Sequence, residues 1–288
     1  MTWSKNLFLS AAILIFRLCC APLVWGEDTA LQLGRELAAL GSYNQAVTEY
    51  KRFICFSTDA EAQCDSYRQI ALAYRAEEKW DEAIAAYQTS LSLAPGDSLR
   101  DDLRIQMAVT LIAAQRYSSA EFALLRVHAF GKYAALKHKA GFFLGVAALY
   151  TAKWDAAREY FADYFSDQPG LRSRIVDSLL APTKHPRQRS PATARRLSTL
   201  LPGSGQVYAG SLRHGLNSLA LNLGTAYLLG SSIADQRYYD AAFVHFSLFW
   251  RYYSGSRYHA ARICQKRNLE LNREYAARVL RALDDLLD

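Results

Sequence analysis

The sequence predicts an all-α protein in which stacked helix pairs are followed by a membrane-associated helical hairpin and a C-terminal amphipathic helix. Three observations in the chain of 288 residues predict this class. Large and small residues recur at a fixed interval in helix-favouring sequence through the first half. Residues 216–233 form an uncharged run, and residues 262–287 place apolar side chains at helical spacing.

Four aromatic residues define the repeat, because they lie 37 residues apart and each is followed three residues later by alanine. A large residue follows four positions after each alanine, and a large-small pair lies ten positions before each aromatic residue. Small side chains let two helix backbones approach, while large ones fill the remaining space, so the pattern predicts helix pairs. The positions assigned to this packing are Leu33, Gly34, Tyr43, Ala46, Tyr50, Ile70, Ala71, Tyr74, Trp80, Ala83, Tyr87, Tyr117, Ala120, Leu124, Leu144, Gly145, Trp154, Ala157 and Phe161.

This register resembles the tetratricopeptide repeat, and the second repeat, from Trp80 through Ala83 to Pro95, resembles it most. The likeness covers residues 29 to about 170. It implies a solenoid whose concave side binds a helix or an extended peptide of another protein. A further helix at Leu171–Leu180 is expected to cap the array, so we assign residues 29–181 to four repeats and their cap.

The N-terminus has the features of a secretory signal peptide at residues 1–26. A basic start precedes an apolar stretch, and Gly26 lies before the acidic pair Glu27 and Asp28. Arg17 interrupts the apolar stretch, so an uncleaved anchor remains an alternative. The interpretation predicts an exported protein, associated with a membrane of the cell envelope, with a periplasmic repeat domain.

Two cysteines of the first repeats suggest a disulfide. Cys55 is expected at the end of one helix and Cys64 at the start of the next, across a single turn between repeats. An exported protein meets an oxidising compartment, which favours a bond between them. The alternative is that both are small buried residues.

Positive charge is concentrated on either side of the uncharged run, within a formal net charge of +7. Residues 182–200 contain three prolines and form a predicted basic linker. An exported protein rarely meets nucleic acid, so we expect the basic residues to face anionic lipid; a solvated linker is the alternative. The side chains assigned to lipid are Arg187, Arg189, Arg195 and Arg196.

Residues 201–255 are predicted to form a glycine- and tyrosine-containing turn and an apolar hairpin. The turn resembles that of small modules with two transmembrane helices, which implies membrane placement without catalysis. Its matching residues are Pro202, Gly203, Gly205, Gln206, Tyr208, Gly210 and Gly215. The uncharged run is barely long enough to cross a bilayer, and the next apolar run, 241–250, is shorter. We expect Gly224 and Gly230 to lie on faces where another helix packs closely.

Residues 256–288 are predicted to form an amphipathic helix that docks on the repeats or lies on lipid. No nucleophile with a base, metal-ligand set or phosphate loop is recognisable in the sequence, so we expect neither enzyme activity nor a cofactor or metal. The predicted function is a non-catalytic envelope scaffold that binds another protein at the membrane. The alternative is a protein whose basic flanks and hairpin bind or organise anionic lipid. The oligomeric state stays open.

Overall fold

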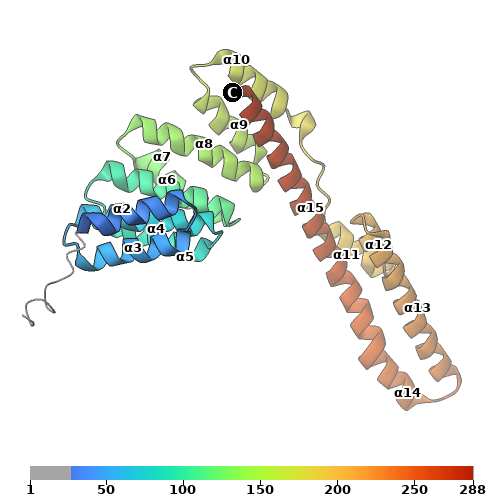
Figure 1. The fold of residues 1–288 in the computed structure, drawn as a ribbon. Helices are drawn as coiled ribbons and strands as arrows, with labels where there is room; N and C mark the ends of the chain where they lie inside the picture. Colours follow the sequence, from blue (N-terminus) through green and yellow to red (C-terminus); the bar gives the residue numbers. More distant parts are fainter. Residues whose placement is uncertain (1–26, 288) are drawn as a thin grey trace, which may run out of the picture. The chain divides into compact units, whose positions relative to one another are not determined.

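The computed structural model describes residues 27–287, and all the regular secondary structure in that range is helical (Figure 1). The predicted signal peptide, residues 1–26, lies outside the described residues. The chain divides into two compact units, one ending at Ala147 and the other beginning at Ala148. This boundary lies inside α8 (Ala134–Tyr150), whereas the sequence placed residues 29–181 in one domain.

The first unit is a series of helix pairs, and each helix contacts the next one along the chain. The pairs are α2 (Glu27–Ala39) with α3 (Tyr43–Phe56), α4 (Ala60–Ala76) with α5 (Trp80–Leu93), and α6 (Asp97–Ala113) with α7 (Tyr117–Phe130). Each leading aromatic residue of the repeat begins the second helix of its pair, as does Trp154 at the start of α9 (Trp154–Tyr164). The predicted stacked helix pairs are confirmed.

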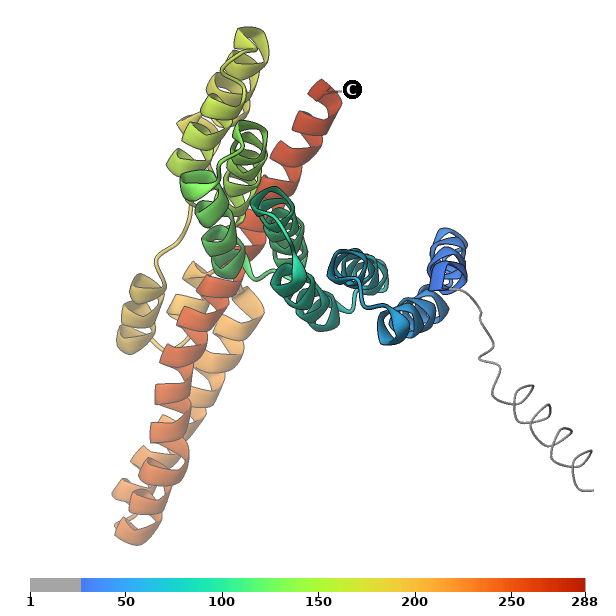
Figure 2. The same ribbon diagram turned by 90° about the vertical axis from the view of Figure 1, so that its left-hand side faces the viewer.

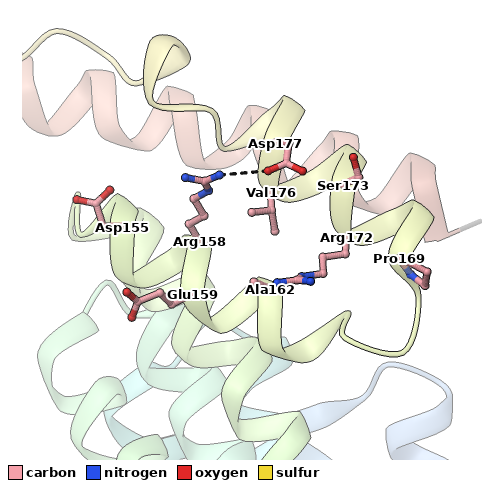
Figure 3. Close-up of a pocket in the computed structure, with 9 residues that line it drawn as sticks. All are labelled: Asp155, Arg158, Glu159, Ala162, Pro169, Arg172, Ser173, Val176 and Asp177. Atoms are coloured by element: carbon pink, nitrogen blue, oxygen red, sulfur yellow. Dashed lines mark hydrogen bonds and ion pairs between the residues drawn. The ribbon is translucent and has the colours of Figure 1, made fainter.

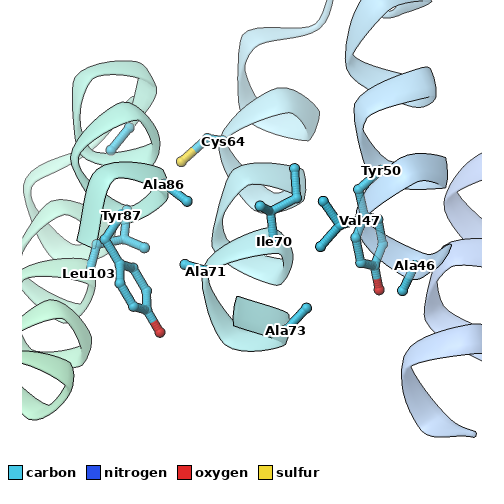
Figure 4. Close-up of a cluster of buried hydrophobic side chains, with 11 residues drawn as sticks. Ala46, Val47, Tyr50, Cys64, Ile70, Ala71, Ala73, Ala86, Tyr87 and Leu103 are labelled. Carbon is cyan, nitrogen blue, oxygen red and sulfur yellow. The ribbon is translucent and has the colours of Figure 1, made fainter. Parts of the chain in front are cut away.

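The core of the first unit is built from the small and large residues of the repeat (Figure 4). Ala46, Ala83, Ala120 and Ala157 are fully buried, and so are the large residues four positions later, from Tyr50 to Phe161. At Gly34 the close approach is direct, because a Cβ atom there would lie 2.7 Å from the Tyr50 ring. Burial also raises the pKa of the Tyr50 and Tyr87 phenols. The alanines and large residues assigned to packing are therefore buried, and Gly34 lies against the Tyr50 ring.

The turn inside each helix pair repeats with the same 37-residue period as the core. Gly41, Glu78, Gln115 and Ala152 all have positive φ angles, between 57° and 76°. The next residue donates its backbone N–H across the turn, as Lys79 does to the Tyr74 oxygen at 2.9 Å. This is the Schellman ending of a helix, in which a left-handed residue lets the chain reverse.

The second unit continues from α9 through α10 (Pro169–Arg172) and the π-helix η1 (Ser173–Leu179), which occupies the predicted capping segment. Trp154, the leading aromatic residue of the fourth repeat, stacks on His185 with ring centroids 4.7 Å apart. Tyr275 closes the group at 6.1 Å from the Trp154 ring. A residue of the C-terminal helix thus covers the last repeat position.

The predicted linker, residues 182–200, is mostly ordered. It contains the short 3₁₀-helix η2 (Pro182–Lys184) and the helix α11 (Pro191–Leu200). The Ser190 side chain accepts a hydrogen bond from the Thr193 N–H at 3.2 Å, and Pro191 occupies the first helical position. Both residues favour helix initiation, so prolines that signalled a linker begin a helix here.

The hairpin consists of α12 (Ser204–Tyr208), α13 (Leu212–Ala234) and a second arm. That arm runs from α14 (Tyr238–Phe243) through the π-helix η3 (Val244–Phe249) into α15 (Trp250–Leu287). Figures 1 and 2 show α13 beside the first half of α15. The predicted boundary between residues 255 and 256 therefore lies within a continuous helix.

Within residues 27–287, no helix combines the length and apolar character needed to cross a membrane. The predicted transmembrane segment, 216–233, is part of α13, where Asn217, Asn222 and several hydroxyl side chains lower its apolar content.

Candidate interaction surfaces

The first helices of neighbouring repeats are joined by ion pairs, which define a first-helix face. Arg35 of α2 lies 3.7 Å from Asp65 of α4, and Asp65 also pairs with Arg68 at 2.5 Å. On the next repeats, Lys139 of α8 lies 3.1 Å from Asp102 of α6. These side chains are all partly exposed. The face therefore offers both signs of charge along successive repeats, a pattern suited to a polar peptide.

The two cysteines of the first repeats are free thiols in the structure, so the predicted disulfide is not formed. Cys55 is exposed at the end of α3. Cys64 faces the core, where its Sγ donates to the Ser90 carbonyl oxygen at 3.2 Å. Cys64 is therefore buried while Cys55 is exposed, a difference that their separation in the sequence did not indicate.

A cavity of about 510 Å³ lies beside the end of the array, between α9, α10 and η1 (Figure 3). Charged side chains of both signs line it, including Arg158, Arg172 and Glu159. Arg158 is already paired with Asp177 at 3.1 Å. The cavity presents no nucleophile beside a histidine base. Elsewhere in the described range, no group of three His, Cys, Asp or Glu side chains is placed to hold a metal ion.

The predicted membrane turn is instead a packed joint between α11, α12, α13 and α15, which we call the hairpin joint. Gly203 has φ +99°, a left-handed conformation that favours glycine. A Cβ atom on Gly205 would overlap the carbonyl oxygen of Ala194 in α11. Gln206 is only 2% exposed. The residues around Pro202, Gly210 and Gly215 therefore serve packing within the protein.

Hydrogen bonds of buried side chains run across the hairpin joint. Gln206 Oε1 accepts from Ser198 Oγ at 3.0 Å, and Gln206 Nε2 donates to the Ser256 carbonyl oxygen at 3.0 Å. Ser218 Oγ donates to Ser256 Oγ at 2.7 Å. One amide thus links three helices. The sequence pointed to Gln206 but not to its serine partners, which are common residues far apart in the chain.

Three of the four arginines assigned to lipid are exposed without an ion-pair partner among residues 27–287: Arg187, Arg195 and Arg196. Arg189 is different, because its guanidinium donates to the Tyr208 carbonyl oxygen and lies 5.7 Å from the Tyr208 ring centroid. Its backbone is held by Asn268, whose Nδ2 donates to the Arg189 carbonyl oxygen at 2.7 Å. Arg189 is a structural contact of the hairpin joint.

The seam between the hairpin arms is polar. The residues that α13 buries are Gly215, Asn222, Thr225 and Ser232. The glycines expected to pack closely, Gly224 and Gly230, face open space. In the sequence, the spacing of Ser218, Asn222, Thr225 and Ser232 already marks one helix face.

Large apolar side chains lie on the outside of the hairpin, and together they form the hairpin apolar surface. Its members are Leu212, Leu216, Leu221, Leu223, Tyr227, Leu228, Ile233, Tyr238, Tyr239, Phe243, Phe246 and Trp250, each at least 46% exposed. Leu216 and Leu221 are five residues apart, so they point roughly 140° away from each other on α13. The surface therefore extends around much of the helix and is not a single stripe.

The only Asp, Glu, Lys or Arg residues between 214 and 250 are Asp235, Arg237 and Asp240, at the hairpin tip. They pair with one another, because Arg237 lies 3.3 Å from Asp235 and 3.6 Å from Asp240. Pairing of this kind lowers the free energy needed to remove charges from water. The charged side chains of the tip are thus paired with one another within residues 235–240.

The family model of the tetratricopeptide repeat matches residues 64–97, which comprise most of α4, all of α5 and the turn to α6. This stretch is similar to a tetratricopeptide repeat. The matched segment is the second of the four units that share the 37-residue spacing. It contains Ala71, Tyr74 and Tyr87 in their expected packing positions.

Two solved structures are similar to part of the chain. TPR-like repeats from a Podosopora anserina protein assigned as a kinesin light chain are 16% identical, with a TM-score of 0.41, and cover 59% of this chain and 82% of their own. BtubC (BKLC) from P. vanneervenii is also 16% identical, with a TM-score of 0.41, and covers 66% of this chain and 75% of its own. No curated protein matches the chain significantly.

Proposed function

We propose that this protein is a non-catalytic scaffold of the cell envelope, whose repeats bind another protein while the hairpin inserts into a lipid layer without crossing it. Tetratricopeptide repeats suggest a role in protein–protein interaction. The observation that supports the lipid part is the reversed burial of the hairpin, with Asn222, Thr225 and Ser232 inside and leucines outside. Export of the chain, inferred from residues 1–26, belongs to the same proposal.

The reversed burial favours lipid over a protein partner. A partner protein covers one face, whereas the hairpin apolar surface extends around α13. Polar and small residues at a helix seam, with apolar residues outside, are typical of helices packed in an apolar medium. Exposed arginines at the base of the hairpin, Arg187, Arg195 and Arg196, suit an anionic headgroup layer.

Flotation with vesicles of phosphatidylcholine and phosphatidylglycerol tests the lipid part. The double variant Leu216→Glu with Leu223→Glu changes two exposed residues of α13 and is expected to abolish flotation while helix content is kept. Phe122→Glu on α7 is the matched control, since Phe122 is 75% exposed but lies in the repeats. Flotation of the double variant at the wild-type level would exclude insertion by the hairpin.

A photoreactive residue on the first-helix face tests the protein-binding part in intact cells. We expect a discrete crosslinked product from position 106 in α6 and none from Gln88, an exposed residue of α5. Charge reversal of Asp65 and Asp102 should remove the product, because both acids belong to the first-helix face. Equal products from both positions would argue against a binding face on the first helices.

The lipid-binding alternative keeps one supporting observation, the unpaired exposed arginines at the hairpin base. Reversing the charges of Arg187, Arg195 and Arg196 separates the two functions, whereas Arg189 is left unchanged because it holds the hairpin joint. A scaffold should retain its crosslinked partner in this variant. A protein that works through anionic lipid should lose both flotation and its effect on the membrane.

A further inference from the structure

A cavity of about 400 Å³ lies between the two arms of the hairpin, just beyond the hairpin joint. Residues of α13 and α15 form its walls, and Gln206 of α12 forms its end. Apolar atoms make up most of its lining, as in ligand pockets generally. Its volume is more than ten times the roughly 30 Å³ that one water molecule occupies.

Asn222 lines this cavity and carries a hydrogen-bond acceptor that the rest of the protein does not use. The residue is 5% exposed, and its Nδ2 donates to the Ser218 carbonyl oxygen at 2.8 Å. Its Oδ1 atom is buried without a hydrogen-bond partner in the described structure. Buried polar atoms are nearly always paired, so this oxygen marks a place where a donor belongs. The neighbouring polar groups of Gln206 and Ser256 are already satisfied by each other.

The rim of the cavity is basic. Arg251 and His259 of α15 and His214 of α13 line it, and none of the lining residues is acidic. Arg251 forms no ion pair with any residue in the range 27–287. His214 is held by Ser211, whose Oγ lies 2.7 Å from His214 Nδ1. One permanent positive charge therefore lines the same cavity as Asn222.

We propose that this cavity binds the headgroup of a glycerophospholipid. The phosphodiester would contact Arg251, and a hydroxyl or ammonium group of the headgroup would donate to Asn222 Oδ1. The acyl chains would lie along the hairpin apolar surface, which includes Leu221 on the cavity wall. This site rests on the proposed insertion of the hairpin and adds a headgroup preference to it.

The choice between headgroups follows from the acceptor. Phosphatidylglycerol carries hydroxyl donors and phosphatidylethanolamine an ammonium donor, whereas the trimethylammonium group of phosphatidylcholine has no N–H to donate. The three lipids share the phosphodiester, so Arg251 alone does not distinguish them. Selection against the choline headgroup is therefore the specific sign of the Asn222 contact.

The test uses the full chain in vesicles that contain equal amounts of the three lipids, followed by mild detergent extraction and native mass spectrometry of the retained lipid. Wild-type protein should retain the glycerol or ethanolamine lipid over the choline lipid by about tenfold, as expected for one buried hydrogen bond. Asn222→Leu should remove this preference. It should also make the hairpin more resistant to unfolding, because a buried unpaired polar atom is replaced by an apolar group.

Two arginine variants complete the experiment. Arg251→Gln should lower the retention of all three lipids, whereas Arg262→Gln, an exposed residue outside the cavity, should not. Equal retention of the three lipids by wild-type protein would overturn the proposal, even if flotation shows that the hairpin inserts. If the wild-type protein does not float with the vesicles, insertion of the hairpin is itself refuted. If soluble glycerol phosphate displaced the lipid, the ligand of the cavity would be a free phosphate ester, and the proposal of a lipid ligand would be wrong.

Discussion

The helix pairs of the repeats and the helix pair of the hairpin turn the chain in the same way but bury opposite kinds of residue. Gln236 has a φ of 58°, and the Arg237 N–H donates to the Ser232 oxygen at 2.9 Å, as in each repeat turn. Ala241 is buried three residues after Tyr238, as Ala83 is after Trp80. Yet α5 buries Ile84 and Tyr87, whereas α13 buries Asn222 and Thr225. Local turn chemistry thus sets the hairpin geometry, and the surroundings set which side chains lie inside.

The largest difference in the free energy of unfolding between the two regions should appear when a tyrosine of each is replaced by alanine. Tyr87→Ala empties a fully buried position, and we expect it to lower the free energy of unfolding by about 3–5 kcal/mol. Tyr227→Ala removes a side chain that is 75% exposed and should change the free energy of unfolding by less than about 0.5 kcal/mol. Urea unfolding followed by circular dichroism measures both. Similar losses would mean that the hairpin has an inward-facing apolar core after all.

Two glycines of the hairpin sharpen the comparison, because Gly205 packs against another helix whereas Gly224 faces open space. Gly205→Ala should destabilise the hairpin joint by about 1–3 kcal/mol, since its Cβ atom meets the Ala194 carbonyl oxygen. Gly224→Ala should stabilise α13 by about 0.5–1 kcal/mol, because no atom lies within 4 Å of its Cβ position. Hydrogen exchange of the α13 amides reports both changes. If Gly224→Ala destabilised instead, another helix would have to pack there.

The shared turn predicts that one substitution acts alike in both regions. Gln115→Gly and Gln236→Gly each relieve a left-handed conformation and should stabilise by about 1 kcal/mol. Ala85→Gly, at an exposed position inside α5, is the control and should destabilise by a similar amount. Thermal unfolding of the three variants provides the measurement. If one of the two glycine substitutions stabilised the protein and the other destabilised it, the two turns would not be equivalent despite their similar backbone angles.

The smallest expected effect concerns an ion pair of the repeats. A hydrogen bond from Lys132 lowers the pKa of the Asp97 carboxyl, and the same bond raises the pKa of Lys132. The contribution of Asp97 to stability is therefore present above its unfolded pKa, about 3.9, and is lost as the pH falls through the lower folded pKa. Both side chains are largely exposed, so the effect should be modest.

A carboxyl titration followed by nuclear magnetic resonance measures the Asp97 pKa directly. Lys132→Gln should return it to the ordinary range, whereas Lys139→Gln, which removes the partner of Asp102, should leave it lowered. A wild-type Asp97 that titrates normally would show that this ion pair is not maintained in solution.

The repeat part of the fold could be predicted closely, because its packing depends on residues at a fixed spacing. Ala46, Ala83, Ala120 and Ala157 are all fully buried where the 37-residue interval placed them. The disulfide predicted between Cys55 and Cys64 was wrong, since a separation of nine residues does not reveal that Cys64 faces Ser90 across the repeat. The sequence analysis placed a boundary between residues 255 and 256, whereas α15 continues through it and contacts α11, α12 and α13, which no local sequence pattern shows.

By itself the sequence determined the helical class, the period of the repeats and the uncharged character of residues 216–233, because these follow from residue spacing and composition. Only the tertiary structure decided that Asn222, Ser218 and Ser256 face inward and that the leucines of α13 face outward. It also decided that Gln206 joins α11 to α15. The physical reason is that burial and hydrogen bonding depend on which helix faces meet, and residues 50 positions apart in the chain meet only after folding.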